Sequence, residues 1–452
     1  MSSTLLWVRR DLRLRDQPAL LMAARAGEVL PVFVVDPALS RRRLPRTERL
    51  SASLAALHRA TGGALVIRTG HPAQVVPSVA KEAGAAEVHV TGETTPYGRR
   101  RDDGVARALA DAGRRLVPTG TPYAVDPGTL LTGAGTPYQV FTPFHRAWRD
   151  QVRPPAPAPD AVRWLRDVPS ESLPDAPRDA EAGEEAALAR WQDFLREGLP
   201  GYAERRDRPD LDGTSRLSAA LKYGELHPRT LLADLARSEA DDADVGRFVA
   251  ELGWREFYAD VLWHHPGSAW HDLHDDLRGL AYDDPDGSDD VRALVEAWRT
   301  GRTGYPFVDA GMRQLLAEGW MHNRVRMVTA SFLTKDLHVW WPVGARHFLD
   351  LLRDGDLASN NHGWQWVAGT GTDPAPYFRI LNPIAQGKRF DPDGDYVRRW
   401  VPELRHLSGV EAHEPWSHPE GYLHGYPERV VDHVSERKEA LARYEARRGA
   451  GT

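Results

Sequence analysis

The first 118 residues alternate between short apolar runs and longer amphipathic segments. The apolar runs at 4–8, 29–35, 64–67, 87–90 and 115–118 have the length and composition of buried strands. The segments between them, such as PALLMAARAG and AQVVPSVAKEAG, carry the periodicity of helices. Because strands that alternate with helices are joined by right-handed crossovers, this pattern predicts a doubly wound, mostly parallel α/β sheet.

The pattern changes in the middle of the chain. The stretch 153–187, which contains RPPAPAPD and SLPDAPRDAEAGEEAA, is rich in proline, alanine and acids and has little apolar periodicity. Such a composition is typical of a linker that runs over the surface. From about residue 188 onward the periodicity is helical and strand signals are scarce. We therefore predict an α/β domain over 1–130, a linker over 131–187 and a mostly α-helical domain over 188–452.

Composition narrows the classes of function. The 452 residues contain no cysteine, which excludes disulfides, thiol nucleophiles and cysteine-ligated metals. The net charge of -6 neither indicates nor excludes nucleic-acid binding, which depends on where the basic residues lie. No apolar run approaches the roughly 20 residues of a membrane helix, and the N-terminus lacks the order of a signal peptide. We expect a cytoplasmic, monomeric protein that does not bind membranes.

Two short segments place chemically useful residues on one helical face. In ELGWREFY, Glu251, Trp254 and Arg255 stand at i, i+3 and i+4. In WMHNRVRM, Asn323 and Met327 stand four residues apart. Taken alone, each has a simpler explanation: a surface ion pair beside a core tryptophan, and a basic turn before a core helix.

Other motifs leave similar alternatives open. GTSRLSAALKYGEL (213–226) places three hydroxyls at an expected helix start, which suits either a phosphate site or a simple N-cap. HDLHDD (271–276) lacks a third ligand and reads as a solvated turn, so no metal site is predicted. Neither a G-x-G-x-x-G after the first strand nor a G-x-x-x-x-G-K-[ST] motif is present, which argues against ordinary dinucleotide and P-loop sites.

Taken together, five segments closely resemble the DNA photolyase/cryptochrome family in both order and spacing. The resemblance extends from about residue 4 to 420, begins with WVRRDLRLRDQPAL, and is nearest to class I cyclobutane pyrimidine dimer photolyases. It implies a carbon–carbon lyase that repairs UV-damaged DNA by light-driven electron transfer from reduced FAD. The five segments are TSRLSAALKYGELHPR, ELGWREFY, TGYPFVDAGMRQL with GWMHNRVRM, ASFLTKDL, and DGDLASNNHGWQWVAGTGTDPAPYFRILNP.

The resemblance implies a U-shaped FAD within the helical domain, working as FADH-. Arg326 would pair with Asp354 against the flavin, and Asn360 would face N5. Photolyases carry asparagine at this position, whereas plant cryptochromes carry aspartate and insect ones cysteine; a neutral amide does not readily protonate N5 and so favours the reduced anion. The cofactor-binding residues implied are Tyr202, Thr214, Ser215, Leu217, Ser218, Arg255, Asn323, Arg326, Asp354, Asp356 and Asn360.

The resemblance also implies a pocket for a flipped-out dimer, whose poor stacking lowers the cost of flipping. Trp254 and Trp366 would form its aromatic walls, and Met327 would pack on the pyrimidine rings. Glu251 and Asn323 would bond the base edges, with Glu251 stabilising the charge that appears after electron transfer. Phosphates flanking the lesion would be held by Arg206, Arg324 and Arg379.

Related activities remain as alternatives. A (6-4) photolyase would carry two histidines where this chain has Asn323 and Met327, and the DASH branch usually has glutamine at 327. His322, directly before this position, reads as a structural residue. A cryptochrome-like blue-light photoreceptor is disfavoured by Glu251 and Asn360, by the Asn323–Met327 pair and by the short C-terminal tail.

The resemblance also implies residues that reduce the flavin by light-driven electron transfer and a second, light-harvesting chromophore. Trp364 and Trp341 match the first two tryptophans of the family's photoreduction chain, but the third is missing. Either Tyr282 or a further tryptophan such as Trp270 would replace it. The segment TPYGRRRDDGVARAL (95–109) favours 8-hydroxy-deazaflavin as antenna over methenyltetrahydrofolate.

Overall fold

The computed structural model describes residues 2–39, 44–159, 161–175, 181–274, 277, 279–372 and 379–449. The chain forms two compact units. The first comprises Met1–Tyr138, Thr142–Pro200 and Ser215–Pro266, and the second comprises Gln139–Phe141, Gly201–Thr214 and Gly267–Thr452. These units do not follow the predicted domain boundaries at 130 and 187, which stay a prediction.

The first unit contains a parallel five-stranded sheet with strand order β3-β2-β1-β4-β5, so the predicted α/β fold is confirmed. The third strand begins two residues later than expected because it pairs from Val66 to Thr69 with the second half of β2. The order reverses between β1 and β4, and the carboxyl ends of strands at such a switch point are where ligands bind in this architecture. The strands are β1 (Ser3–Val8), β2 (Glu28–Val35), β3 (Val66–Thr69), β4 (Glu87–Val90) and β5 (Arg115–Pro118).

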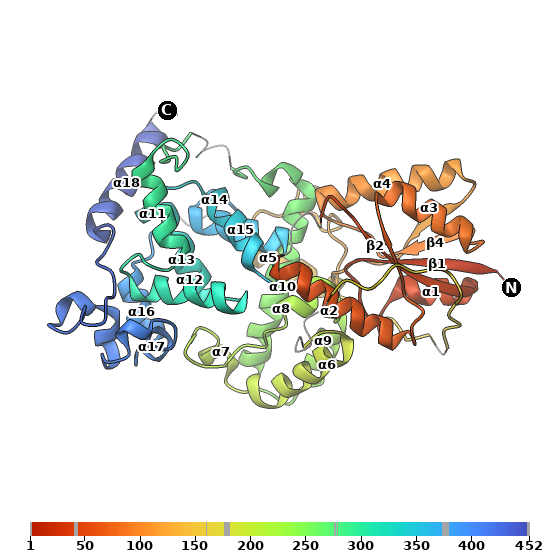
Figure 1. The fold of residues 1–452 in the computed structure, drawn as a ribbon, viewed down its shortest axis with the longest axis horizontal. Helices are drawn as coiled ribbons and strands as arrows, with labels where there is room; N and C mark the ends of the chain where they lie inside the picture. Colours follow the sequence, from red (N-terminus) through yellow and green to blue (C-terminus); the bar gives the residue numbers. More distant parts are fainter. Residues whose placement is uncertain are drawn as a thin grey trace. The chain divides into compact units, whose positions relative to one another are not determined.

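Helices cover both faces of this sheet (Figure 1). Alternation along β1 sends Leu5 and Trp7 into one core and Leu6 and Val8 into the other. The first core is closed by α3 (Pro72–Glu82) and α4 (Pro96–Asp111), and the second by α1 (Pro18–Ala26) and α2 (Pro45–Ala60). The sheet is therefore buried on both sides, which explains its nearly continuous apolar strands.

Part of the predicted linker is more ordered than a surface connection. Helix α5 (Phe141–Gln151) lies inside it and buries Trp148, whose indole N–H donates to Glu256 at 2.6 Å. Further along, the backbone around Trp164 bridges to Val29 of the sheet. These contacts were not predicted because the proline-rich segment has no apolar periodicity. A few buried aromatic residues are enough to fix such a segment on the domain.

The first unit also holds α6 (Glu184–Asp193), α8 (Ser218–Tyr223), α9 (Pro228–Leu235) and α10 (Asp242–His264). The helical periodicity expected from about residue 188 onward is interrupted at Gly224, which adopts φ +66. A Cβ there would lie 1.9 Å from the carbonyl oxygen of Arg10, so only glycine fits this close approach. On α10, Asp260 accepts a hydrogen bond from the Gly128 N–H at 2.7 Å.

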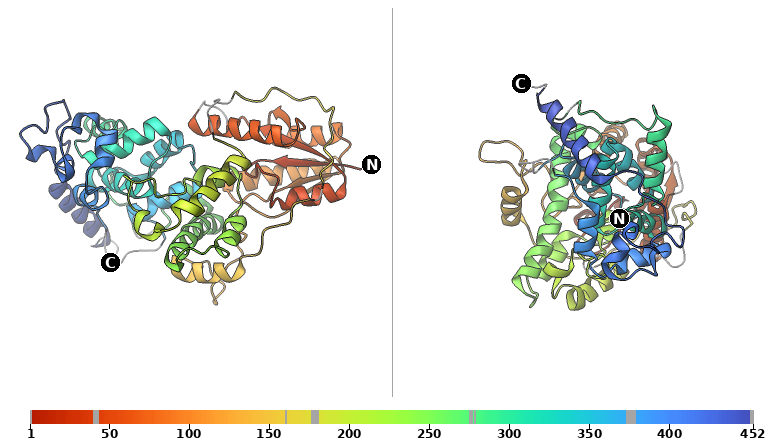
Figure 2. Two further views of the ribbon diagram at one scale, coloured as in Figure 1. Left: turned by 90° about the horizontal axis from the view of Figure 1, so that it is seen from below. Right: turned by 90° about the vertical axis from the view of Figure 1, so that its left-hand side faces the viewer.

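The second unit is helical in its described residues and is organised around one core that includes Trp298, Phe307, Trp341 and Trp364. Its last helix packs on the π-helical turn η4 (Phe332–Asp336) through an ion pair of 2.5 Å between His433 and Asp336 (Figure 2, dark blue). In the described residues, no helix is long and apolar enough to cross a membrane. The main helices are α7 (Tyr202–Arg205), α11 (Asp289–Arg299), α12 (Pro306–Glu318), α13 (Asn323–Ser331), α14 (Trp341–Leu351), α15 (Leu357–Ala368), α16 (Pro383–Phe390), α17 (Asp395–Trp400) and α18 (His433–Gly449).

Candidate functional site

The acid- and amide-rich segment 354–366 forms the start and body of α15. Asp356 caps the helix by accepting a hydrogen bond from the Ser359 N–H at 3.1 Å. One turn later, the Asn360 amide nitrogen donates to the Ala345 carbonyl at 3.1 Å and to Asn361 Oδ1 at 2.8 Å. These two bonds use both hydrogens of the amide, so Asn360 presents its oxygen as an acceptor.

The loop before α15 is joined to α13 by a partly buried ion pair. Arg326 donates to Asp354 Oδ2 at 2.8 Å and, through Nε, to the Met321 carbonyl at 2.7 Å. Asp354 is 6% exposed, and its Oδ1 atom has no hydrogen-bond partner within the described part of the chain. A buried carboxylate oxygen without a donor is rare and marks a place where a ligand can supply one.

Helix α13 begins at the predicted Asn323. His322 caps it by accepting a hydrogen bond from the Arg324 N–H at 3.2 Å, and burial lowers the pKa of His322 to about 4. A neutral, buried capping histidine fits the structural role predicted for it. Asn323 is exposed, and Met327 follows four residues later as a half-buried side chain.

Trp366 and Arg379, which the sequence assigns to the lesion wall and to a phosphate, lie against one another. The Arg379 guanidinium carbon is 4.6 Å from the centre of the indole ring. The Trp366 indole nitrogen is buried and lacks a hydrogen-bond partner among the described residues. Residues 373–378 of the same motif lie outside the described residues.

The predicted phosphate contacts Arg206 and Arg324 share a neighbour that the sequence did not single out. Arg324 donates to Asp207 Oδ2 at 2.9 Å, and Arg206 Nε lies 3.6 Å from Asp207 Oδ1. The Arg324 guanidinium carbon is also 4.4 Å from the centre of the Phe390 ring. The sequence could have pointed to Asp207 only through its position next to Arg206. Its pairing with Arg324 spans 117 residues and therefore leaves no local pattern.

The two predicted photoreduction tryptophans are both buried. Trp364 packs edge-on against Phe348 at 5.0 Å, and Gly344 makes room for it, since a Cβ there would lie 2.2 Å from the indole. Trp341 donates its indole N–H to Asp272 at 2.7 Å. The expectation of a solvated turn at 271–276 was therefore wrong for Asp272; residues 275–276 lie outside the described residues.

Tyr282 lies close to the same carboxylate. Burial and the charge of Asp272 raise the pKa of its phenol, and the hydroxyl is buried without a hydrogen-bond partner among the described residues. The backbone N–H of the next residue, Asp283, donates to the His338 carbonyl at 2.9 Å, which ties this segment to the loop that precedes Trp341. The structure thus brings Tyr282, Asp272 and Trp341 into one region.

In the first unit, α10 carries the predicted Glu251, Trp254 and Arg255. Arg255 donates to the carbonyls of Pro122 and Leu221, each at 3.2 Å, and lies over the Tyr123 ring. Trp254 packs on Phe257 and Tyr258 with ring centres 5.8 and 5.5 Å apart. These contacts fix both side chains, so the simple picture of a surface ion pair does not describe Arg255.

The predicted phosphate-binding segment is divided between the units. Ser215, Leu217 and Ser218 belong to the first unit, and Tyr202 and Thr214 belong to the second. Ser215 Oγ accepts a hydrogen bond from the Leu217 N–H at 3.4 Å. Arg216, between Ser215 and Leu217, adopts φ +50, a strained backbone conformation that is frequent at functional sites. Ser218 is the first residue of the six-residue helix α8, and its side chain is exposed.

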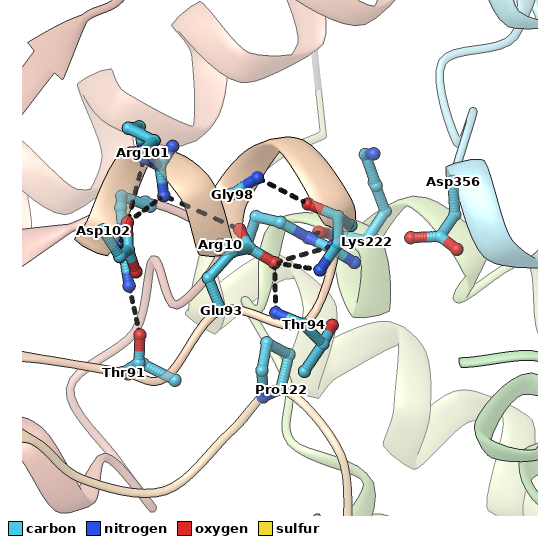
Figure 3. A network of polar contacts seen from close by, with 12 residues as sticks. Arg10, Thr91, Glu93, Thr94, Gly98, Arg101, Asp102, Pro122, Lys222 and Asp356 are labelled. Atoms are coloured by element: carbon cyan, nitrogen blue, oxygen red, sulfur yellow. Dashed lines mark hydrogen bonds and ion pairs between the residues drawn. The ribbon is translucent and has the colours of Figure 1, made fainter. Parts of the chain in front are cut away.

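A second cluster lies at the switch point of the sheet in the first unit (Figure 3). Asp102 of α4 pairs with Arg9 at 2.5 Å and with Arg101 at 2.9 Å. Glu93, after β4, lies 3.8 Å from both Arg10 and Arg101. Burial alone would raise the pKa of Glu93, but the three arginines outweigh it and lower the pKa to about 2. Three guanidinium groups thus face two carboxylates.

Comparison with known proteins agrees with this geometry. The family description "DNA photolyase" matches residues 4–160, and "FAD binding domain of DNA photolyase" matches residues 248–446. A "Deoxyribodipyrimidine photo-lyase" of Streptomyces griseus is 43% identical, with 99% of this chain and 100% of the relative covered. That of Escherichia coli strain K12 is 39% identical, with 99% of each chain covered.

Two solved structures share the fold. The bacterial class III photolyase from Agrobacterium tumefaciens is 37% identical with a TM-score of 0.92, covering 99% of this chain and 98% of that one. The cryptochrome of Synechocystis sp. PCC6803 is 27% identical with a TM-score of 0.88, covering 98% and 99%. Since a repair enzyme and a cryptochrome both superpose, the fold alone does not separate the two activities. The identities and the coverage of the whole chain show that the protein belongs to the DNA photolyase family.

Proposed function

We propose that this chain is a deoxyribodipyrimidine photo-lyase that repairs cyclobutane pyrimidine dimers in DNA with light. The observation that carries the proposal is the arrangement on α15 and the loop before it. There, one short segment presents an amide oxygen of Asn360 and an oxygen of Asp354 to which none of the described residues donates. A ligand rich in N–H donors, such as a flavin, suits such a pair of acceptors.

The residues present fit FAD in its reduced form. Because the Asn360 hydrogens are occupied, its oxygen can accept from a nitrogen that carries a proton, as N5 does in FADH-. Arg326 holds one oxygen of Asp354 in place, so that the second oxygen can accept a further hydrogen bond. When bound and excited by light, reduced FAD supplies the one electron that opens the dimer.

The lesion would be recognised by amide, thioether, carboxylate and aromatic side chains. Asn323 is exposed at the start of α13, where its amide can bond a base edge, and Met327 presents a polarisable side chain one turn later. Trp366 and Trp254 would supply aromatic surfaces for the fused pyrimidines. Glu251 would stabilise the charge that the dimer acquires, so that splitting of its two carbon–carbon bonds precedes return of the electron.

Phosphates on either side of the lesion would be held by Arg206, Arg324 and Arg379. Such contacts position DNA without reading its sequence, and they make affinity depend on salt. The stacking of Arg379 on Trp366 supports a role at the rim of the lesion pocket, where one side chain can reach the backbone while the other contacts the base.

The residues around Asn323 favour cyclobutane dimers over (6-4) photoproducts. Repair of the latter requires a group that transfers a proton, which neither Asn323 nor Met327 provides. His322 does not replace it, because its ring is buried, its Nδ1 atom accepts a backbone N–H, and its pKa is lowered to about 4. A histidine in that environment stays neutral at physiological pH.

For photoreduction of oxidised flavin, we propose Tyr282 as the terminal donor after Trp364 and Trp341. A phenol that loses an electron also releases its proton, and Asp272 is the nearby carboxylate whose charge acts on Tyr282. The bond from Trp341 to Asp272 supports this order, since it places the same acid beside both aromatic residues.

The switch-point cluster in the first unit is the proposed antenna site. Its arginines are in excess over its carboxylates, and the Trp7 indole nitrogen beside them is buried without a hydrogen-bond partner among the described residues. An anionic, aromatic chromophore suits this environment, and 8-hydroxy-deazaflavin is preferred to methenyltetrahydrofolate. The absorption band of the purified protein distinguishes the two.

A paired substrate assay tests the proposed function. The protein, purified with FAD and chemically reduced, is illuminated with oligonucleotides that carry either a cyclobutane dimer or a (6-4) photoproduct. We expect restored pyrimidines from the first substrate alone. Repair of the second substrate would refute the assignment to cyclobutane dimers, and repair of neither would favour a photoreceptor. Cytoplasmic location and a monomeric state stay predictions.

A further inference from the structure

The carboxylate of Asp207 lies between two arginines that the proposed function assigns to DNA phosphates. It accepts a hydrogen bond from Arg324 at 2.9 Å and forms a longer ion pair of 3.6 Å with Arg206. All three side chains are partly exposed, at 14% for Arg206, 33% for Asp207 and 20% for Arg324. The group is therefore neither buried in the core nor fully solvated, and it can be reached from solution.

The geometry of this group is that of an anion-binding site already filled from within the chain. Two guanidinium groups hold one carboxylate, and the Phe390 ring supports Arg324 from another side at 4.4 Å. Carboxylate and phosphate oxygens make the same charge-assisted bonds to arginine. A DNA phosphate that binds these arginines must therefore displace the Asp207 carboxylate. Otherwise the phosphate must bind beside that carboxylate and be repelled by its negative charge.

We propose that Asp207 acts as an internal substitute for a DNA phosphate and weakens the grip of Arg206 and Arg324 on DNA. The inference rests on the proposed function, which makes these arginines phosphate contacts. Most of the affinity for intact DNA comes from such contacts, so a built-in competitor limits the time spent on undamaged sites. Asp207 lowers the affinity for DNA phosphates and does not touch the reacting atoms.

The test measures affinity for intact and for dimer-containing duplexes over a range of salt concentrations. In Asp207→Asn the arginines gain one net positive charge, so both duplexes should bind about 2- to 5-fold more tightly at low ionic strength. The slope of log affinity against log salt should become steeper by about 0.9, which corresponds to one more neutralised phosphate. Asp207→Ser should behave in the same way, so the result does not depend on one variant folding well.

Two controls isolate the effect. Asp395→Asn makes the same change of charge at another exposed ion pair, with Arg398, and should leave the affinity and the slope almost unchanged. In an Arg324→Gln background, Asp207→Asn should lose most of its gain, because the two substitutions act on one interaction. A gain that persists fully in that background would show a general charge effect and overturn the proposal.

The outcomes separate this proposal from the one on which it rests. If Arg324→Gln weakens DNA binding but Asp207→Asn does not tighten it, the proposal for Asp207 fails and the phosphate grip stands. If neither Arg206→Gln nor Arg324→Gln weakens binding, the assignment of these arginines to phosphates fails first.

Discussion

Arg326 on α13 and Asp354 before α15 form an ion pair of 2.8 Å, and the second oxygen of the carboxylate is buried without a donor among the described residues. Arg326→Gln removes the cation from this buried acid. We expect a loss of about 1–3 kcal/mol in the free energy of unfolding together with a lower content of bound FAD. Urea unfolding and the ratio of flavin to protein absorbance measure the two effects.

A matched control for this variant is Arg398→Gln, which breaks a more exposed pair with Asp395. Exposed pairs contribute little, so this control should change neither quantity appreciably. Undiminished FAD content in Arg326→Gln would contradict a role for the Arg326–Asp354 pair at the cofactor.

Glu251 is proposed to act on charge that exists only after electron transfer. Glu251→Ala should therefore lower the number of dimers repaired per absorbed photon several-fold while changing affinity for the lesion much less. Binding is measured in the dark and repair under a known photon flux. Equal repair per photon in the variant would remove Glu251 from this role.

The environment of Tyr282 gives a prediction for photoreduction that leaves repair untouched. Tyr282→Phe keeps the ring but removes the ionisable hydroxyl beside Asp272. Photoreduction of oxidised flavin should become slower and less complete, whereas repair by chemically reduced protein should stay the same. Normal photoreduction in Tyr282→Phe, with loss in Trp270→Phe, would move the terminal donor to Trp270.

Asp260 predicts a specific pH dependence of stability. Burial raises its pKa from the usual 3.8 to about 6, although a hydrogen bond from the Gly128 N–H partly opposes this shift. Between about pH 4 and pH 6 the folded state holds a proton that the unfolded state releases, so Asp260 makes stability fall as pH rises through this window.

Asp260→Asn keeps an acceptor for Gly128 and has no proton to lose. We expect the variant to be more stable than the unmodified protein by about 1–3 kcal/mol at pH 7, with the difference shrinking towards pH 4. Urea unfolding across this range measures it. A variant that is less stable than the unmodified protein at pH 7, with the difference disappearing towards pH 4, would show instead that the ionised carboxylate is stabilising.

The sequence allowed the sheet and the helix faces to be predicted because both depend on local periodicity. The alternation in β1 and the spacing of Asn323 and Met327 needed no knowledge of distant residues. The other site residues were predicted only from the resemblance to a family. Neither the burial of Asp354 nor the orientation of Asn360 follows from the neighbouring residues in the chain.

The interactions that escaped prediction connect residues far apart in sequence. Asp207 meets Arg324 across 117 positions and was not singled out from the sequence. Asp272 meets Trp341 across 69 positions and was interpreted as part of a solvated turn. Trp148 was hidden for a similar reason, since its partner Glu256 lies on another helix. Such polar contacts depend on tertiary packing and leave no periodic trace.

The central claim is that light drives an electron from reduced FAD into a bound cyclobutane dimer. Its most direct test is to illuminate the reduced, FAD-containing protein with an oligonucleotide that carries one cyclobutane thymine dimer and to quantify restored thymines by chromatography. We expect restoration that is proportional to light dose and absent in the dark. No restoration under light, with FAD bound and reduced and the oligonucleotide bound, would contradict it.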